Sequence, residues 1–322
     1  MARVLSGIQP SGSLHIGNYF AMMKPMIELQ NSSELFCFIV NYHAMTSLHD
    51  GAELRKNTVE AAIDFLALGL DPEKCFFWVQ SDVPEVTELS WILSCHTSLG
   101  LLERSHSYKD KVARGLIPNA GLYTYPILMA ADILLYDANI VPVGKDQKQH
   151  IEITRDIAGS FNTAYGDIFV IPEGKIEDDV ATIPGIDGQK MSKSYGNTLD
   201  IFEDEKSLKK KVMKIVTDST PVEDPKDPDT CSVFALYKLF ATESQLKDMR
   251  EIYLKGGTGY GQVKKDLLDI LIEYFRPYRE NRRRFENDKA EVYNILKKGA
   301  DKTRNVASVT LNRVKNAVGI NY

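Results

Sequence analysis

The sequence predicts an α/β fold: a Rossmann-like, doubly wound parallel sheet followed by a helical domain. Near-continuous apolar runs at residues 35–40, 75–79 and 140–143 are typical of parallel strands that are buried on both faces. Residues 52–69 and 121–136 lie between those runs and place apolar side chains at helical spacing. Strands joined by helices imply right-handed crossovers, so we expect ligands beyond the carboxyl ends of the strands.

An opening strand around Val4 and Leu5 leads into a glycine-containing loop and then a helical pattern from residue 16. Gly7 and Gly12 allow a tight turn and a close backbone approach to a ligand. Either Ser11 or Ser13 can cap the helix, whose free N–H groups favour an anion. The loop matches neither a P-loop nor a dinucleotide-binding fingerprint, so it indicates a different phosphate site.

His43 follows the run at 35–40, which puts it at the ligand-binding rim. We prefer a cap for the next element as its role and keep a ligand contact as the alternative. Residues 84–97 predict another helix, on which Trp91 is expected in the core or at an interface. The charged segment 102–111 is typical of a solvated insertion, although it can also deliver Lys109 or Lys111 to a phosphate.

Asp132 lies among apolar neighbours in the helix predicted over residues 121–136. A carboxylate in such surroundings is costly without a partner, which is either a structural donor or a ligand N–H. Tyr125 and Met129 share its helix face at i, i+4 and i+7 spacing. We favour the ligand, because an aromatic-lined slot is the usual composition of a small-molecule pocket.

Asp146 and Gln147 follow the predicted strand at 140–143. Asp146 is placed as an N-cap would be, and it can alternatively hold a ribose or a substrate amine. Further along, Lys190 and Lys193 belong to a loop with glycine and proline on its flanks, so we expect a mobile, exposed segment. Two ammonium groups there can stabilise a leaving phosphate group, whereas a solvated basic loop is the alternative.

Composition narrows the class of protein. The 322 residues are 43% hydrophobic and 26% charged, which suits one large or two moderate domains. The net charge of −5 argues against indiscriminate nucleic-acid binding but leaves room for local basic patches. With neither a leader nor a spanning segment recognised, we expect a cytoplasmic protein without membrane contact.

The four cysteines form no closely spaced pair. We therefore expect free thiols, and neither structural zinc nor an iron–sulfur cluster.

The string from His15 to Asn18 resembles the His-Ile-Gly-His signature of class I aminoacyl-tRNA synthetases, and residues 190–194 match their Lys-Met-Ser-Lys-Ser motif. Together with blocks at 7–19, 125–136 and 141–152, they make nearly the whole chain similar to the bacterial tryptophanyl-tRNA synthetase family. The resemblance implies a ligase that joins tryptophan to tRNA(Trp) with ATP and Mg²⁺, and that forms a homodimer.

The resemblance also implies three sets of site residues. Catalytic positions match His15, Asn18, Lys111, Lys190 and Lys193. ATP-binding positions match Gln9, Pro10, Ser11, Gly17, Asn18, Asp146, Ile183, Lys190, Ser192, Lys193 and Ser194. Tryptophan-binding positions match Leu5, Gly7, Gln9, His43, Tyr125, Met129, Asp132, Val141, Val143 and Gln147.

Two domains follow from the resemblance: a catalytic domain over residues 1–195 with a connecting insertion near 98–120, and a helical anticodon-binding domain over 196–322. The last helix can pack back on the catalytic domain, and Arg282 to Arg284 can present a cationic surface to tRNA or form a solvated helix exterior.

Two positions depart from the family pattern. Leu5 stands where an aromatic residue can line the pocket, and Pro25 interrupts the helix after the signature. One alternative function is that of a tyrosyl-tRNA synthetase, and the Gln-Pro-Ser-Gly block and Asp132 argue against it. The other is that of a regulatory protein, which binds amino acid or tRNA without joining them. Lys190 and Lys193 argue against the second alternative.

Overall fold

The computed structural model describes residues 1–322 apart from 11, 13, 105–114, 116–118 and 177–182. It divides into two compact units that interleave along the chain. Unit 1 comprises Met1–Gly12, Met26–Asp178 and Phe285–Tyr322, and unit 2 comprises Ser13–Pro25 and Asp179–Arg284. The sequence predicts two contiguous domains that meet at residue 195, and their assignment to catalysis and anticodon binding stays a prediction.

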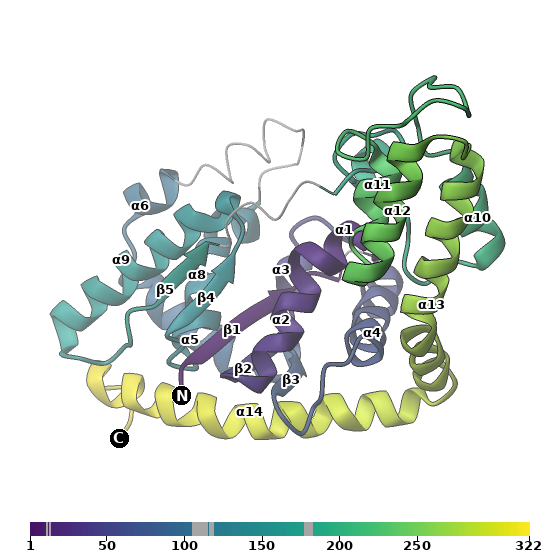
Figure 1. Ribbon diagram of the computed structural model, residues 1–322. Helices are drawn as coiled ribbons and strands as arrows, with labels where there is room; N and C mark the ends of the chain where they lie inside the picture. Colours follow the sequence, from purple (N-terminus) through teal and green to yellow (C-terminus); the bar gives the residue numbers. More distant parts are fainter. Residues whose placement is uncertain (11, 13, 105–114, 116–118, 177–182) are drawn as a thin grey trace. The chain divides into compact units, whose positions relative to one another are not determined.

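Unit 1 contains a five-stranded parallel sheet (Figure 1). The strands are β1 (Arg3–Ile8), β2 (Glu34–Ile39), β3 (Phe76–Val79), β4 (Ile140–Val143) and β5 (Glu173–Ile176), in the spatial order β3-β2-β1-β4-β5. The order reverses between β1 and β4, and the carboxyl ends of strands at such a point are the usual place for a ligand. The predicted α/β fold is confirmed, with β4 at its predicted bounds.

Helices surround this sheet in unit 1. They are α3 (Asn41–Ala44), α4 (Gly51–Ala67), α5 (Glu85–Ser94), α6 (Leu99–Glu103), α8 (Ala120–Leu134), α9 (Lys148–Tyr165) and α14 (Lys289–Val318). The sheet and helices enclose a core in which Phe36 stacks on Phe76 with ring centroids 4.1 Å apart. Trp78 and Tyr136 are fully buried beside them. Burial of such large side chains supplies the main stabilisation of this unit.

The last helix packs against the edge strand β3 (Figure 1). Ala300, Ala307, Leu311 and Val314 of α14 belong to the core of unit 1. Ion pairs from Arg304 to Glu85 on α5 and from Lys315 to Glu88 flank this apolar contact. A covering helix protects an edge strand from pairing with another chain.

Unit 2 begins with an irregular helical segment, in which the sequence predicts an interruption at Pro25. It contains α1 (Ile16–Asn18), a π-helical turn at Tyr19–Met23 and the start of α2 (Lys24–Glu28), with Pro25 in the first turn of α2. Pro25 is tolerated there because a first-turn residue needs no intrahelical N–H bond. The other helices of this unit are α10 (Glu205–Met213), α11 (Ser232–Tyr237), α12 (Glu243–Lys255) and α13 (Tyr260–Asn287), the last of which ends in unit 1.

An aromatic cluster fastens the irregular segment to α13. Tyr19 is buried, and its ring meets Phe275 edge to face with centroids 5.3 Å apart. Its hydroxyl lies 3.2 Å from that of Tyr274. The segment directly after the His15 signature is therefore held by packing within unit 2.

All four cysteines fall in the described part of the chain and are free thiols. Over that same part, the helices are too short or too polar to cross a bilayer. Trp91 on α5 is 72% exposed, so the core placement allowed for it is wrong and the interface alternative stays a prediction.

Candidate active site

Asp132 on α8 is buried, with 2% of its surface exposed, in a polar network at the carboxyl ends of β2 and β3. The amide Nε2 of Gln80 donates to both of its oxygens, at 2.9 Å to Oδ1 and 2.8 Å to Oδ2. The Nε2 of His43 lies 2.8 Å from Oδ2. His43 lies inside α3, whose N-cap position is Val40, so the preferred interpretation of His43 as a cap is wrong.

Burial raises the pKa of Asp132, and the hydrogen bonds from His43 and Gln80 oppose this rise. When His43 Nε2 donates to the carboxylate, its other ring nitrogen becomes an acceptor. That Nδ1 atom is buried and meets no hydrogen-bond donor among the described residues. A buried site with spare acceptors suits a ligand that brings an N–H group.

Tyr125 and Met129 lie on α8 with Asp132 and form one wall beside this network. The ring of Tyr125 stands edge to face with His43, with centroids 5.7 Å apart, and its hydroxyl contacts Nε2 of the buried His150 on α9. Met129 packs on the core of unit 1. The structure therefore brings three of the predicted tryptophan-binding side chains, His43, Tyr125 and Asp132, together around one point.

Other predicted pocket residues of unit 1 lie on β1 and β4 or shortly after them. Leu5 and Val141 are buried in the core, and Val143 packs against it. Gly7 has no space for a side chain, because a Cβ there would lie 2.9 Å from Val40. The remaining positions are an exposed Gln9, a buried Pro10 and a half-buried Gln147.

The two signature motifs both lie in unit 2. Backbone hydrogen bonds join the first motif to the segment that follows the second. Ile16 N–H donates to the carbonyl of Leu199 at 3.0 Å, and Ile201 N–H donates to that of Leu14 at 3.0 Å. These bonds tie the start of α1 to the segment that follows the lysine loop. Two sequence blocks 175 positions apart, from His15 to Lys190, thus belong to one compact unit.

His15 is the N-cap of α1, and its Nδ1 accepts from the backbone N–H of Asn18 at 3.2 Å. The cap is therefore His15 and neither Ser11 nor Ser13, which lie outside the described residues. Burial lowers the pKa of His15, and Lys193 lowers it further. A neutral imidazole whose Nδ1 accepts carries its proton on Nε2, which leaves that atom as a donor.

The same cap favours glycine at position 17, because a Cβ there would lie 2.9 Å from the His15 ring. The sequence argument, that Gly17 leaves room for a base, concerns a ligand and stays a prediction.

The lysine loop is exposed at its charged side chains and fixed at its backbone. Lys190, Lys193 and Ser194 are exposed, while Met191 and Ile183 are buried and joined by a backbone bond of 2.9 Å. Ser192 is half-buried, with its hydroxyl 2.8 Å from that of Ser194. The predicted exposure of the two lysines is confirmed.

Asn197 holds this loop from inside, with 2% of its surface exposed. Its Oδ1 accepts from Ser192 N–H at 2.8 Å, and its Nδ2 donates to the carbonyl of Lys190 at 3.0 Å and to Asp187 Oδ1 at 2.7 Å. One buried amide thus links both sides of the loop that carries the lysines.

Four of the predicted site side chains fall outside the described part of the chain. Ser11, Lys109 and Lys111 lie outside the described residues, as does the side chain of Asp146. The backbone shows that Asp146 is not the N-cap of α9, because that position belongs to Gln147.

Comparison with known proteins identifies the family. The family profile described as "tRNA synthetases class I (W and Y)" matches residues 1–276, most of the chain. The chain belongs to the class I tRNA synthetases.

Relatives of this synthetase match it over nearly its full length. It is 53% identical to the tryptophan–tRNA ligase of Campylobacter jejuni (strain RM1221), over 99% of this chain and 100% of that one. It is 52% identical to the tryptophan–tRNA ligase of Rhodopirellula baltica, over 99% of each chain. The crystal structure of the Campylobacter jejuni enzyme with ADP and tryptophan superposes with a TM-score of 0.95 and 53% identity, and covers 98% of this chain and 99% of that one.

Sequence reasoning missed two polar residues of this synthetase, Gln80 and Asn197. Gln80 directly follows a buried strand, as His43 does, so the same rule could have placed it at the rim. Asn197 stands next to a glycine in a loop, where an asparagine usually indicates only a turn. Nothing local in the sequence separates a turn asparagine from a buried one.

Proposed function

We propose that this synthetase is a tryptophan–tRNA ligase. It activates L-tryptophan with ATP to tryptophanyl-adenylate and pyrophosphate, and then transfers tryptophan to the 3′-terminal ribose of its tRNA. The observation that carries this proposal is the buried Asp132, whose carboxylate is held by Gln80 and His43 inside a chain 53% identical to tryptophan–tRNA ligases. A carboxylate acceptor in an apolar slot is the partner that an indole N–H requires.

The amino acid is oriented by residues of unit 1. Asp132 accepts the indole N–H, and Tyr125, Met129, Val141 and Val143 enclose the ring system. Gly7, Gln9 and Gln147 face the amino and carboxyl groups. Such a site rejects an analogue that lacks the N–H, because the buried acceptor is then left without a partner.

ATP is bound and activated by the residues that match the ATP-binding positions of the family. Mg²⁺ enters with ATP as its counterion. The tryptophan carboxylate attacks the α-phosphorus in line, the bond to the bridging oxygen breaks, and pyrophosphate leaves. No protein nucleophile is needed. Charge stabilisation comes from His15 Nε2–H, Asn18, Lys111, Lys190 and Lys193, because the charge that develops on pyrophosphate meets donors already in place.

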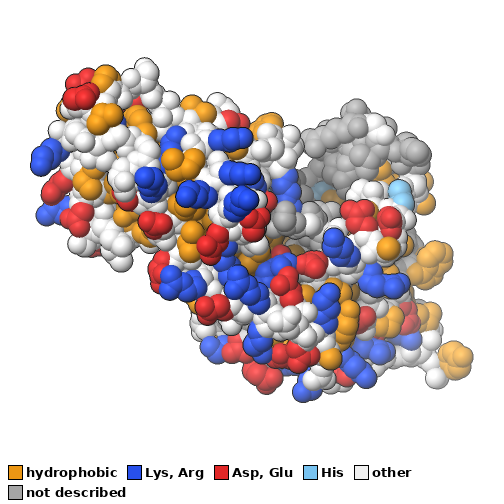
Figure 2. Space-filling model, turned by 90° about the vertical axis from the view of Figure 1, so that its right-hand side faces the viewer, with side chains coloured by type: hydrophobic (Ala, Val, Ile, Leu, Met, Phe, Trp, Pro, Cys, Tyr) orange, Lys and Arg blue, Asp and Glu red, His pale blue; other side chains and the backbone are white. Residues whose placement is uncertain are grey.

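In the helical half, residues 196–322 bind the anticodon arm of tRNA(Trp). On the face drawn in Figure 2, Lys and Arg side chains lie among Asp and Glu, so this face offers tRNA local basic groups rather than one basic surface. The protein acts in the cytoplasm as a homodimer, and the exposed Trp91 supplies apolar surface for its interface.

Amino-acid-dependent ATP–pyrophosphate exchange tests this function, with tryptophan and tyrosine supplied separately. Exchange with tryptophan alone supports the proposal. Exchange with tyrosine alone makes the protein a tyrosyl-tRNA synthetase, and no exchange with either makes it a binding protein.

Asp132→Ala tests the site, with tryptophan compared to an analogue whose ring N–H is replaced by sulfur. We expect the variant to lose about ten- to a hundredfold in kcat/KM for tryptophan, the value of one hydrogen bond to a charged group. The analogue should lose much less. An equal loss for both ligands makes Asp132 a structural carboxylate.

A further inference from the structure

Gln80 is a buried amide at the carboxyl end of β3, with 1% of its surface exposed. Its Nε2 donates to both oxygens of Asp132, and its Oε1 accepts from the backbone N–H of Tyr42 at 3.0 Å. An amide has one donor end and one acceptor end, so the two partners together fix which end faces Asp132. The side chain is therefore locked in one orientation.

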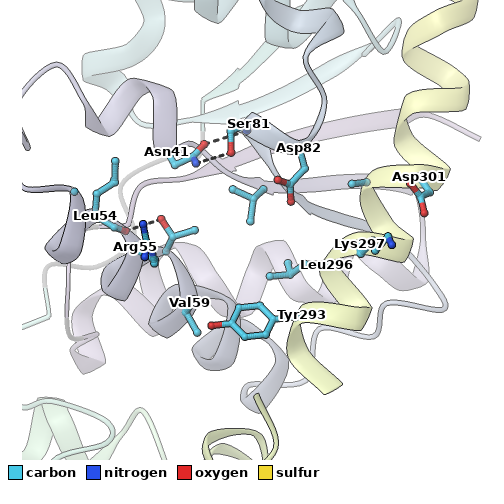
Figure 3. Close-up of a pocket in the computed structure, with 14 residues that line it drawn as sticks. Asn41, Leu54, Arg55, Val59, Ser81, Asp82, Tyr293, Leu296, Lys297 and Asp301 are labelled. Carbon is cyan, nitrogen blue, oxygen red and sulfur yellow. Dashed lines mark hydrogen bonds between the residues drawn. The ribbon is translucent and has the colours of Figure 1, made fainter. Parts of the chain in front are cut away.

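The turn that carries Gln80 is held independently of that side chain. Asn41 Nδ2 donates to Ser81 Oγ at 2.8 Å, and Ser81 N–H donates to Asn41 Oδ1 at 3.1 Å (Figure 3). Ser81 and Asp82 line an open hollow of about 630 Å³ between α4 and α14, which none of the predicted site residues lines. The turn thus presents Ser81 to that hollow and Gln80 to the core, so replacement of Gln80 need not release the turn.

A carboxylate offers about four lone-pair sites, two on each oxygen. One N–H of Gln80 Nε2 is shared between the two oxygens of Asp132, and His43 adds a second contact at Oδ2. Oδ2 thus has two polar contacts and Oδ1 only the shared one, so Oδ1 is the more open acceptor. The pattern of donors selects which oxygen remains available and stabilises the ionised form of a fully buried acid.

We propose that Gln80 is a positioning residue for tryptophan recognition, which holds Asp132 so that Oδ1 keeps one lone pair for the ring N–H of the substrate. This inference rests on the indole-binding role of Asp132 proposed above. Without the Gln80 donor, the carboxylate either turns within its slot, which misdirects the acceptor, or takes up a proton, which replaces a charged acceptor with a weaker neutral one. Recognition of the ring N–H then fails even though Asp132 is still present.

The test uses Gln80→Met, which keeps the length of the side chain and removes both its donor to Asp132 and its acceptor for the Tyr42 N–H. We expect kcat/KM for tryptophan in pyrophosphate exchange to fall about ten- to a hundredfold, the effect of one hydrogen bond to a charged group, through KM rather than kcat. The sulfur analogue should change by no more than about threefold, as for a substitution away from any specific contact. Gln80→Glu, which sets a second carboxyl group against Asp132, should damage tryptophan use further.

Ser81→Ala is the matched control, because it removes the bond from Asn41 Nδ2 to the Ser81 hydroxyl in the same turn and leaves both donors of Asp132 in place. A selective loss for tryptophan in Gln80→Met but not in Ser81→Ala supports the proposal. The same selective loss in both variants overturns it, because the effect then belongs to the turn. If Gln80→Met does not fold, the same comparison is made with Gln80→Glu.

Asp132→Ala separates this proposal from the one on which it rests. Equal losses for the two ligands in Gln80→Met, with selective loss in Asp132→Ala, overturn the role of Gln80 alone. Equal losses in Asp132→Ala overturn the indole-binding role of Asp132 itself.

Discussion

Gly299 of α14 packs directly on the backbone carbonyl of Phe77 in β3, so closely that a Cβ at residue 299 would collide with the carbonyl oxygen. Backbone atoms in a sheet cannot move aside as a flexible side chain can. The close approach brings the neighbouring Ala300 into the core and the Lys302 ammonium to 4.1 Å from the centre of the Phe76 ring. The close packing of α14 on β3 therefore requires glycine at position 299.

Gly299→Ala is expected to destabilise unit 1. Overpacking typically costs about 1–3 kcal/mol, while alanine at an unstrained helical position gains about 1 kcal/mol over glycine. Urea unfolding measures the difference. Gly159→Ala in α9 is the matched control, since a Cβ there meets no atom within 4 Å among the described residues, and it should stabilise the protein. A Gly299→Ala variant as stable as Gly159→Ala would contradict the close packing.

His15 makes stability depend on pH in a predictable direction. Its pKa in the folded protein lies below the ordinary value of 6.5 because of burial and Lys193. The unfolded chain then binds the proton more readily, so this contribution is present above pH 6.5 and is lost as pH falls toward the folded pKa. His15→Asn keeps a capping acceptor for the Asn18 N–H and removes the titration.

The free energy of unfolding should therefore fall more steeply below pH 6.5 for wild type than for His15→Asn. Denaturant unfolding at several pH values measures both curves. Parallel curves would show that His15 is protonated alike in the folded and unfolded states.

The sheet was predictable because its strands are local apolar runs, and β4 needed no more than the pattern at 140–143. The rim position of His43 followed from the same runs. The prediction of a serine cap for α1 was wrong because the start of this helix depends on a distant segment. The cap is His15, and the N–H of the next residue, Ile16, donates to the carbonyl of Leu199. The contact of Gly299 with Phe77 spans more than 200 positions, and a glycine inside a helical pattern gives no sign of it.

The three arginines of α13 do not have one common role. The guanidinium of Arg282 lies 4.9 Å from the centre of the Phe202 ring, and its side chain is half-buried. Arg283 and Arg284 are exposed. A cationic surface for tRNA is therefore better tested with the second and third arginines than with all three.

Replacement of Arg283 and Arg284 by Ala should weaken tRNA binding and aminoacylation while sparing pyrophosphate exchange. The salt slope of tRNA binding should become shallower by about 1–2 units if each arginine meets one phosphate. Arg276→Ala is the control on the same helix, since it is an exposed arginine outside the 282–284 run. An unchanged salt slope would make Arg283 and Arg284 a solvated surface.

Asn197 offers a way to disturb the lysine loop without touching either lysine. Its amide binds the carbonyl of Lys190 and the N–H of Ser192, and it also bonds Asp187, whose pKa it lowers. Asn197→Ala removes all three bonds. Asn197→Asp keeps an acceptor for the Ser192 N–H but sets a carboxylate against Asp187, so the Asp187 side of the loop should loosen in both variants.

Both variants should slow pyrophosphate exchange with little change in tryptophan affinity, because the proposed tryptophan site lies in unit 1 and the loop is proposed to act on ATP. A displacement of about 1 Å at a charge-stabilising group can cost about a hundredfold in rate. Stopped-flow activation kinetics and equilibrium tryptophan binding separate the two effects. Gln189→Ala is the control in the same loop, since this exposed side chain takes no part in the Asn197 bonds. If the control slows activation as much as Asn197→Ala does, the loss reflects general sensitivity of the loop; if neither does, the lysines are positioned without Asn197.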